Sequence, residues 1–574
     1  MVNLIIDNRS VTVEDGTTIL DAARKINIKI PTLCYLDLGK LKMLNKVSSC
    51  RICSVEVEGR RNLAPSCSTP VTEGMKVKTN SKRVLFARRK ILELLLSNHP
   101  FDCLLCSKST DCELQSLAVE FGIETQHYHG EKSSFPIDIS SRALRRDPEK
   151  CIMCRRCETM CNEVQTVKAL TAFGRGFNTV VAPAEMQPLV NSNCVYCGQC
   201  VSVCPTGALT GVGYIKETWA ALFDPTKTVV VQVAPAIRAA IGEEFGIAEG
   251  VPVTGKLAAG LRRLGFNAVF DTTFGADLTI MEEAREIVER VTKNKNLPIL
   301  TSCCPGWINF LEFHFPDLKY MPSTSKSPHQ MMGTVIKTFY ARKLGVQPSD
   351  VVVVSVMPCI AKKYEAAQPE HETGGVRDVD YVITTRELAK MFKEGGIDLR
   401  YMDDEDFDDP LGESTGAGVI FGATGGVLEA ALRTVYEEVT GKTLDNVNFE
   451  AIRGLNGVKE AAIDLNGRIV RVAAASGLGN VRQILEKIQE GSSQYDVIEI
   501  MACPGGCVNG GGQPFCEDRE ERIEKRMKAL YSIDSNAEIR KSHENPSIKK
   551  LYAEFFGEPG SEKAHELLHT EYWM

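Results

Sequence analysis

Cysteine is the residue type in this sequence that could carry the most chemistry. The 574 residues include 21 cysteines, and many of them are separated by only two or three residues. Cysteines used as small buried hydrophobic groups would be scattered, and disulfides are rare in the reducing cytosol, whereas metal ligands are clustered by short spacings. The cysteines therefore predict bound metal centres.

The strongest pattern is a pair of C-x2-C-x2-C-x3-C runs, "CIMCRRCETMC" and "CVYCGQCVSVC". Such pairs are typical of bacterial ferredoxins with two 4Fe–4S clusters, in which the fourth cysteine of each run binds the cluster of the other run. The expected ligands of one cluster are Cys151, Cys154, Cys157 and Cys204. Those of the other cluster are Cys194, Cys197, Cys200 and Cys161.

Two further sets precede these runs. The first set lies among strand-like segments with one helix-like segment, and consists of Cys34, Cys50, Cys53 and Cys67. This context favours a 2Fe–2S cluster in a β-grasp, ferredoxin-like fold, although the spacing alone also permits zinc. The second set, which fits a 4Fe–4S cluster or a Cys3His zinc site, consists of His99, Cys103, Cys106 and Cys112. Four accessory clusters, one 2Fe–2S and three 4Fe–4S, would form an electron wire.

The remaining chemistry follows apolar segments that are far apart in the sequence. "LPILTSCCP", "VVVVSVMPC" and "VIEIMACPGGC" alternate with helix-like segments, which predicts an α/β domain with mostly parallel strands. Ligands of such sheets bind beyond the carboxyl ends of strands, so these cysteines are expected at one site. Cys303 and Cys304 are adjacent, and neighbouring side chains on an extended chain point to opposite faces. The two thiols are therefore expected to have different roles.

These segments resemble a known family. "TSCCPGW", "VMPCIAKKYEA" and "MACPGGCVNGGGQP" are similar to the three signature segments of the iron-only (FeFe) hydrogenases. The cysteine ladder resembles that of the larger, clostridial-type members and of the iron–sulfur subunit of respiratory NADH dehydrogenases. The resemblance covers essentially the whole chain. It implies reversible H2 oxidation and proton reduction at an H-cluster, which is a 4Fe–4S cube joined to a two-iron unit carrying CO, CN⁻ and a dithiolate bridge.

The resemblance also implies roles for single residues. The implied ligands of the cube are Cys304, Cys359, Cys503 and Cys507, with Cys507 as the bridge to the two-iron unit. Cys303 would then be free to carry protons, Lys362 would donate a hydrogen bond to a cyanide, and Met357 would pack against the two-iron unit. Two positions near the cluster depart from the family pattern: Ala236 replaces a frequent serine, and His329 replaces a frequent glutamine.

A proton relay is implied as well. Glu283, Ser323 and Glu286 match the family's route between Cys303 and the surface. Without the resemblance, the two glutamates would be interpreted as an exposed acidic helix face paired with Arg285 or Arg290.

The expected organisation is multidomain. It comprises a β-grasp 2Fe–2S domain, a small His/Cys3 domain, a two-cluster ferredoxin domain, a large two-lobed α/β H-cluster domain and a C-terminal helical segment wrapping it. The expected boundaries are 1–80, 81–125, 126–212, 213–516 and 517–574.

Composition limits the setting. The net charge of −7 argues against a nucleic-acid partner, no apolar run approaches the ~20 residues of a membrane span, and no export signal is visible at the start. We therefore expect a cytoplasmic protein. Its substrates would be H2 and protons. Its electron partner would be ferredoxin, or it would belong to a complex with flavin/NAD(P)-binding and thioredoxin-like 2Fe–2S subunits. Such a complex could carry out electron bifurcation. A non-catalytic iron–sulfur carrier is the main alternative, and an H2 sensor or an iron–sulfur assembly factor ranks below it.

One further motif needs a separate explanation. "HELLH", at 565–569, fits the H-E-x-x-H pattern of zinc proteases. Only five residues follow it, which leaves no room for the usual third ligand, so an amphipathic terminal helix, "AHELLHTEYW", is the better prediction.

Overall fold

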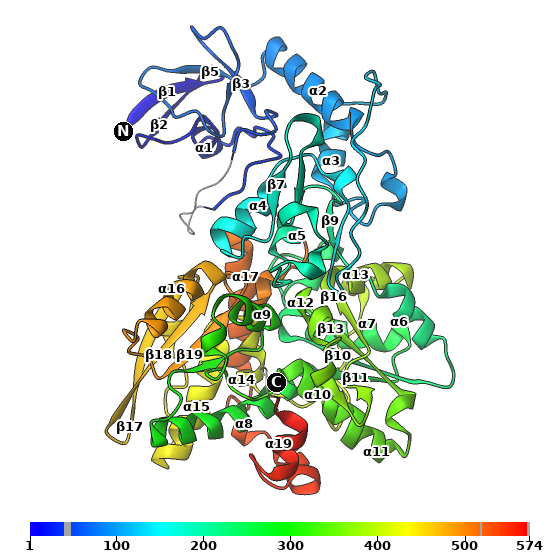
Figure 1. Cartoon of the computed structure of the whole chain (residues 1–574), viewed down its shortest axis with the longest axis vertical. Helices are drawn as coiled ribbons and strands as arrows, with labels where there is room; N and C mark the ends of the chain where they lie inside the picture. Colours follow the sequence, from blue (N-terminus) through cyan, green and yellow to red (C-terminus); the bar gives the residue numbers. More distant parts are fainter. Residues whose placement is uncertain (39–46, 517–518, 571–574) are drawn as a thin grey trace. The chain divides into compact units, whose positions relative to one another are not determined.

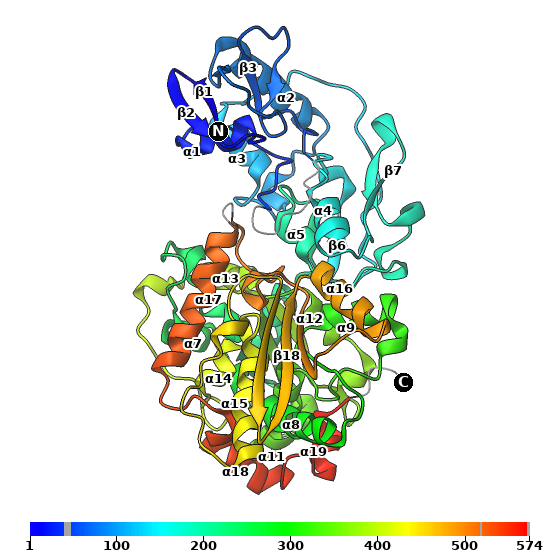
Figure 2. The same cartoon turned by 90° about the vertical axis from the view of Figure 1, so that its left-hand side faces the viewer.

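The computed structural model describes residues 1–38, 47–516 and 519–570. The chain forms two compact units (Figures 1 and 2). Unit 1 contains Met1–Val164, Lys168–Cys194 and Val203–Thr210, and unit 2 contains Gln165–Val167, Val195–Ser202 and Gly211–Met574. The segment Val195–Ser202, which carries two cysteines of the second ferredoxin run, thus packs within unit 2.

Unit 1 begins with a five-stranded mixed sheet in the order β2-β1-β5-β3-β4, covered by one helix. The elements are β1 (Val2–Ile6), β2 (Arg9–Val13), α1 (Ile19–Lys25), β3 (Ser54–Val57), β4 (Ala64–Pro65) and β5 (Lys76–Lys78). Side chains of β1 alternate between buried and exposed, because one face of the strand packs on the helix and the other faces solvent. This is the expected β-grasp arrangement.

The next part of unit 1 consists of helices and short strands. α2 (Lys82–Ser97) begins at Ser81, whose hydroxyl accepts a hydrogen bond from Val84 N and caps the helix. Its buried face packs with cysteines of several predicted cluster sites in one apolar core. α3 (Glu113–Glu120), α4 (Arg156–Thr159), and the hairpin of β7 (Thr171–Phe173) and β8 (Val180–Ala182) follow.

Unit 2 contains two four-stranded sheets, as the two-lobed prediction requires. The first sheet is fully parallel and consists of β11 (Ala268–Asp271), β10 (Thr228–Val233), β13 (Val351–Met357) and β16 (Tyr381–Thr384) in that order. The second consists of β12 (Ile299–Thr301), β19 (Val497–Met501), β18 (Arg468–Ser476) and β17 (Val458–Leu465), with only β17 antiparallel. β10, β13 and β19 are almost wholly buried, which is why they appear in the sequence as continuous apolar runs.

One long helix belongs to both lobes. α8 (Thr272–Lys293) starts at Asp271, whose carboxylate accepts a hydrogen bond from Thr273 N. Phe274 and Leu278 lie in the core of the first lobe, whereas Ile280 and Ala284 lie in the core of the second. α8 therefore fixes the two sheets against each other and carries the glutamates of the predicted relay.

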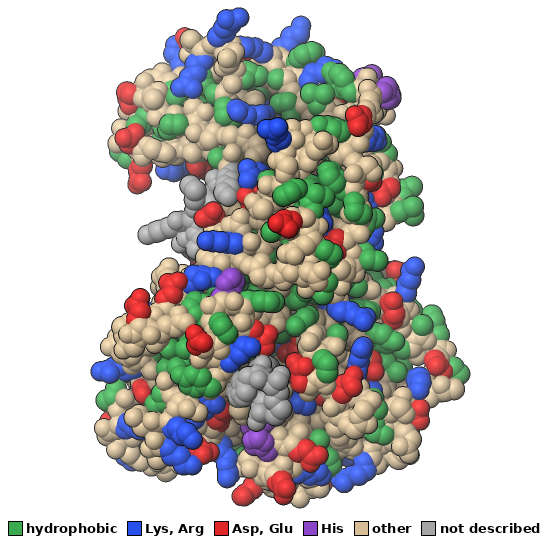
Figure 3. Space-filling model, viewed as in Figure 1, with side chains coloured by type: hydrophobic (Ala, Val, Ile, Leu, Met, Phe, Trp, Pro, Cys, Tyr) green, Lys and Arg blue, Asp and Glu red, His purple; other side chains and the backbone are tan. Residues whose placement is uncertain are grey.

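The C-terminal part of unit 2 consists of α17 (Arg519–Asn536), α18 (Pro546–Leu551) and α19 (Glu562–Leu568), coloured orange to red in Figure 1. Residues 571–573 of the predicted terminal helix lie outside the described residues. No described helix is both long and apolar enough to cross a membrane. On the face seen in Figure 3, side chains of both charge signs are interspersed.

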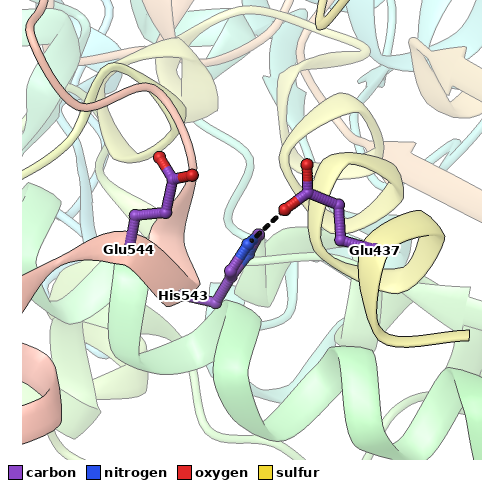
Figure 4. Close-up of side chains that lie close together, drawn as sticks. All are labelled: Glu437, His543 and Glu544. Carbon is purple, nitrogen blue, oxygen red and sulfur yellow. Dashed lines mark hydrogen bonds and ion pairs between the residues drawn. The ribbon is translucent and has the colours of Figure 1, made fainter. Parts of the chain in front are cut away.

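An ion-pair cluster joins this C-terminal part to α15 (Gly426–Thr440). His543 Nε2 lies 2.8 Å from Glu437, and Figure 4 shows Glu544 standing beside them. Lys541 Nζ lies 2.6 Å from Glu437 and 3.4 Å from Glu544, so one ammonium group pairs with both carboxylates. We interpret the cluster as a clamp between the two segments.

Candidate functional site

Strand ends from both lobes meet at one buried cavity in unit 2. The cavity has a volume of about 60 Å³. The cysteines on its wall follow β12, β13 and β19, and are Cys303, Cys304, Cys359, Cys503 and Cys507. Five thiols that are up to two hundred residues apart in sequence are thus brought together by the two sheets.

The rest of the cavity wall is largely apolar. Met357, Ala236 and Phe421 line it, and Lys362 and His329 are the cationic or titratable groups that face it besides the thiols. Such a wall excludes water and strengthens each electrostatic interaction within it. Ala236 and His329, the two positions that the sequence analysis expects to depart from the family pattern, both lie on this wall.

Burial controls the protonation of the thiols. Burial raises the pKa of Cys304, and it raises that of Cys359 to about 12. Cys303 and Cys507 share a hydrogen bond that lowers the pKa of Cys303 and raises that of Cys507, and the charge of Lys362 further lowers the pKa of Cys303. Cys303 is therefore the thiol that gives up its proton most readily.

The donor set fits a multi-iron cluster better than a single metal ion. In a tetrahedral zinc site the sulfurs would lie roughly 3.8 Å apart. Among the described residues, the only group of three or more cysteine, histidine or carboxylate ligand atoms within 4.8 Å of one another is Glu437, His543 and Glu544. Among the described residues, no three sulfurs of the cavity's cysteines therefore meet as closely as a mononuclear site requires, and a larger iron–sulfur cluster suits this donor set better.

The backbone beside Cys507 is shaped for close approach. Gly506 has φ +96°, and a Cβ atom there would lie 2.6 Å from Thr424 N. Only glycine combines a positive φ with this lack of space. The glycine in "PGGC" is therefore required to bring Cys507 to the cavity wall.

A chain of buried polar groups holds Lys362. Its Nζ lies 2.7 Å from Ser327 Oγ and 2.8 Å from Glu365. The same carboxylate lies 2.7 Å from His329 Nδ1, and His329 Nε2 lies 2.7 Å from Ser355 Oγ. Burial opposes the charge on Lys362, but Glu365 overcomes this effect and raises its pKa, whereas burial lowers the pKa of His329. The lysine is thus held as a cation at the cavity.

The predicted relay residues also lie together. Glu283 is 2 % exposed, and Thr301 Oγ1 donates to its carboxylate at 2.8 Å. Ser323 hydrogen-bonds Glu283 and, at 2.7 Å, Glu286 Oε2. Burial raises the pKa of Glu283 to about 7. An exposed acidic face does not describe Glu283, although Glu286 does pair with Arg290 at 2.5 Å.

Unit 1 holds three of the predicted accessory sites. In the β-grasp part, Cys34, Cys50, Cys53 and Cys67 are all buried. Cys34 and Cys50 lie 3.4 Å apart, and Cys67 lowers the pKa of Cys53 to about 6. In the ferredoxin-like part, burial raises the pKa of Cys151 to about 11, and the charge of Cys204 adds to this effect. Cys204 therefore lies close enough to the first run for its charge to act on Cys151.

The His99 site has the features of a ligand set. His99 Nδ1 lies 2.9 Å from the carbonyl oxygen of Pro100, while its buried Nε2 has no hydrogen-bond partner. A histidine ligand commonly donates one ring N–H to a carbonyl and keeps the other nitrogen free for the metal. A Cβ atom on Gly207 would lie 2.7 Å from Cys106 Sγ, so the loop after Cys204 passes directly beside this set. The two predicted clusters are therefore neighbours in unit 1.

The second ferredoxin run reaches the cavity's cysteines within unit 2. A Cβ atom on Gly306 would lie 3.4 Å from Cys197 Cα, and the charge of Cys197 contributes to raising the pKa of Cys503. Gln199 also donates to the carbonyl oxygen of Asn509 at 2.9 Å. Cys197 of the second run therefore lies beside the cysteines of the cavity in unit 2.

Several residues of the site were not predicted from the sequence. Thr301 hydrogen-bonds the relay residue Glu283, and Glu365 hydrogen-bonds Lys362. Neither residue belongs to a motif that the sequence analysis used. Glu365 could have been found, because it lies three residues after Lys362 on one helix face. Thr301 could not, since its partner Glu283 is on another element.

Family models match most of the chain. The model described as the iron-only hydrogenase large subunit, C-terminal domain, matches residues 227–511, and the iron hydrogenase small subunit matches 520–573. A 2Fe-2S iron-sulfur cluster binding domain matches 1–82, the NADH-ubiquinone oxidoreductase-G iron-sulfur binding region 88–127, and a 4Fe-4S binding domain 189–210. The match at 88–127 favours an iron–sulfur cluster over zinc for the His99 set.

Individual relatives cover the chain from end to end. It is 57% identical to the NADP-reducing hydrogenase subunit HndD of Solidesulfovibrio fructosivorans, over 100% of this chain and 99% of that protein. It is 40% identical to iron hydrogenase 1 of Clostridium pasteurianum, over 100% of both. A solved structure of the [FeFe]-hydrogenase HydA(deltaEFG) covers 63% of this chain and 99% of its own, with 45% identity and a TM-score of 0.56.

Proposed function

The chain belongs to the iron-only hydrogenase family, and we propose that it is the H2-activating, electron-relaying subunit of a complex that exchanges electrons with NAD(P). The observation that carries the hydrogenase assignment is the convergence of cysteines from three strand ends on one water-excluding cavity. A full-length relative is named as a subunit of an NADP-reducing hydrogenase, which supports the complex. A nucleotide-linked reaction and the many reduced thiols support a cytoplasmic setting.

We assign the residue roles as follows. The four cysteines that would hold the cube of the H-cluster are Cys304, Cys359, Cys503 and Cys507. When bound, the H-cluster supplies an iron site that polarises H2 and a base that accepts the proton as the bond splits heterolytically. Met357 packs beside it, and Lys362, held by Glu365 and Ser327, offers a charged donor to it.

The protein's own part of the reaction is to move protons and to exclude water. Cys303, which lines the cavity and is not among the four proposed ligands, exchanges protons there. Glu283, Ser323 and Glu286 then carry protons along α8, with Glu283 near the protonation midpoint at neutral pH because burial raises its pKa to about 7. A carboxyl group of this kind can both give and take a proton.

Electrons would travel through the accessory clusters. The assigned ligands are the β-grasp set for a 2Fe–2S cluster, the His99 set for a 4Fe–4S cluster, and the two ferredoxin runs for two further 4Fe–4S clusters. At the far end, a flavin- and NAD(P)-binding subunit, a thioredoxin-like 2Fe–2S subunit and ferredoxin are the proposed partners. A non-catalytic carrier would have no use for Lys362 or for a free thiol beside Cys304.

The test is H2 production by the full chain after maturation with the two-iron unit. With reduced methyl viologen as donor we expect H2 turnover, together with infrared bands of bound CO and CN⁻. Replacing Cys303 by Ala should lower the rate by at least about 10²-fold, because it removes a general acid–base group, while the infrared bands persist. Absence of turnover in a sample that shows the bands would contradict the assignment. Co-purification with a flavin subunit, and NADP reduction by H2 only in that complex, would test the proposed partner.

A further inference from the structure

Another cavity in unit 2, which we call the polar cavity, adjoins the catalytic cavity. It has a volume of about 110 Å³, and its wall shares Cys303, Cys304 and Pro305 with the wall of the catalytic cavity. Hydroxyl, amide, carboxyl and imidazole groups make up much of the rest of its wall. A water molecule needs about 10–15 Å³ of such space and two to four polar partners. The polar cavity therefore has room and partners for several water molecules.

One wall of the polar cavity is a single face of a helix. α9 (Pro305–His314) begins directly after Cys304. Its residues on the wall follow the three- and four-residue spacing of one helix face, and are Pro305, Ile308, Asn309 and Glu312. Because a helix rises about 1.5 Å per residue, this face extends roughly 10 Å from its first residue to its last. The polar cavity therefore leads about two helical turns away from the cysteines.

The opposite wall leads to the protein surface. It comes from the segment that begins with α12 (Ala361–Glu365), which lies beside α9 (Figures 1 and 2). The residues of this segment on the wall are Tyr364, Glu365, Gln368, Glu370 and His371. Glu365 is buried, whereas Glu370 is exposed. The polar cavity therefore extends from Cys303 to an exposed residue.

Two buried polar atoms on this wall indicate that the polar cavity holds water. Asn309 is 4% exposed and His371 is 2% exposed. Among the described residues, neither Asn309 Nδ2 nor His371 Nδ1 has a hydrogen-bond partner. Buried polar atoms are nearly always hydrogen-bonded, either to protein or to ordered water. Water molecules in the polar cavity would supply the missing partners of both atoms.

Glu312 is the carboxyl group of this wall that can exchange protons. It is half-buried, and burial raises its pKa, while the charge of Lys319 lowers it and that of Glu370 raises it further. A carboxyl group with a raised pKa gives and takes protons more readily near neutral pH. Besides the thiols, the titratable and charged groups that act on Glu312 or share its cavity are Lys319, Tyr364, Glu365, Glu370 and His371.

The two other buried titratable groups on this wall are held in one protonation state. Burial opposes the charge of Glu365, but Lys362 and His329 outweigh this effect and lower its pKa, so Glu365 stays ionised. Burial lowers the pKa of His371 to about 3, so its ring stays neutral. Neither group therefore competes with Glu312 for a travelling proton.

We propose that the polar cavity is a second route for protons between Cys303 and solvent, with water molecules as carriers and Glu312 as the group that exchanges protons within it. On H2 production, a solvent proton enters near Glu370, binds Glu312 and passes along hydrogen-bonded water to Cys303. It travels in reverse on H2 oxidation, and only protons move in these steps. No residue of the relay along α8 lines the polar cavity, so the two routes share only Cys303.

The inference rests on the proposed function of Cys303, and its test uses the full-length, matured enzyme with the relay blocked by Glu283→Gln. With reduced methyl viologen, we expect this variant to keep a measurable residual rate of H2 production. Adding Glu312→Gln should lower the residual rate about tenfold, because it removes the exchanging carboxyl group. Adding Glu312→Asp should keep at least about half of the residual rate, since the carboxyl group remains. The matched control is Asp317→Asn, which removes an exposed carboxyl group outside the polar cavity and should leave the residual rate unchanged.

A second variant tests the water in the polar cavity. Asn309→Leu replaces a polar group of the wall by an apolar group of similar size, and in the Glu283→Gln background it should also lower the residual rate. It should not lower the melting temperature, because the amide that it removes has an unpaired buried nitrogen. A lowered melting temperature would show that Asn309 is paired within the protein, and would remove the evidence for water.

Exchange of D2 with the protons of water provides a readout that needs no electron donor. The formation of HD should fall with the residual rate when Glu312→Gln is added, while the infrared bands of CO and CN⁻ persist. Absence of any residual rate in Glu283→Gln would overturn the proposal, and so would a residual rate that Glu312→Gln leaves unchanged. An equal loss with Glu312→Asp would indicate a structural contact and would also overturn it. A wild-type enzyme without turnover would overturn the proposed function as well, whereas the other outcomes concern the polar cavity alone.

Discussion

The accessory sites of unit 1 and the catalytic cavity of unit 2 use the same side chain in two different ways. In unit 1, a loop such as Cys151–Cys157 supplies three of the proposed ligands of a site within seven residues. In unit 2, the cysteines follow β12, β13 and β19, and two sheets are needed to bring them together. The first kind of site depends on local chain geometry, and the second on the tertiary fold.

This difference in how the cysteines are brought together determines which reaction each kind of site can support. A local loop surrounds one cluster and leaves little room for substrate, which suits electron transfer. Strand ends that converge from two lobes leave a space between them, and here that space also admits Lys362, Met357 and the free thiol of Cys303. Placement at strand ends also puts the long helix α8, with its buried Glu283, against the cavity. Catalysis therefore belongs to the fold-dependent site.

The largest expected effect comes from replacing one proposed ligand in each region and comparing the two variants. Cys359→Ser should lower methyl viologen-driven H2 production by more than about 10³-fold, because the cofactor carries the chemistry. Cys53→Ser should leave that rate within about twofold of wild type, since a small dye can pass electrons to the enzyme without using the 2Fe–2S cluster. Rates with each variant and electron paramagnetic resonance of the reduced clusters measure both effects.

The control for this comparison is the spectrum of the other region. The accessory-cluster signals should persist in Cys359→Ser, and the infrared bands of CO and CN⁻ should persist in Cys53→Ser. If Cys53→Ser abolished dye-driven turnover, the two regions would not be separable in the way proposed.

The sequence predicted the fold to a considerable extent, for physical reasons that differ between regions. The buried runs before Cys304, Cys359 and Cys503 became β12, β13 and β19, because fully buried parallel strands consist of continuous apolar residues. The hairpin of β17 and β18 was not predicted. Its strand β17 alternates polar and apolar residues, as one exposed face requires, and contains no chemical motif that draws attention to it.

The polar network around the cavity was beyond sequence reasoning. Thr301 and Ser355 are ordinary strand residues, and only their tertiary partners, Glu283 and His329, give them a role. His569 is a similar case, since its motif predicted only part of a terminal helix, whereas the structure places its side chain on Thr324 and Glu282. Contacts between groups on different elements, whether 18 or 287 residues apart in sequence, have no local signature.

The second prediction concerns the free energy of unfolding that the fold-dependent site loses by burying the carboxyl group of Glu283. Burial raises the pKa of Glu283 from 4.5 to about 7, so the folded protein binds the additional proton between these values. The contribution to stability is fully present below pH 4.5 and is lost as pH rises through about 7, by up to about 3 kcal/mol. Glu283→Gln does not ionise, so its melting temperature should exceed that of wild type at pH 8 and approach it at pH 5. Glu289→Gln, an exposed change on the same helix, should show no such gain.

The smallest effect concerns the residue by which this chain departs from its family at the cavity wall. His329 uses both ring nitrogens, one on Glu365 and one on Ser355, each at 2.7 Å. A glutamine places both of its polar atoms on one amide group, so His329→Gln should leave one of these buried partners unpaired and destabilise the fold by about 1–3 kcal/mol. Lys362 keeps its contact with Ser327, so H2 production should fall less than tenfold, with a small shift of the infrared CN⁻ bands. A melting temperature equal to that of wild type would mean that water or a rotated Glu365 replaces the lost bond. In that case the histidine would not fix the position of Lys362, and the fold-dependent site would tolerate exchange of its polar supports as readily as a surface loop does.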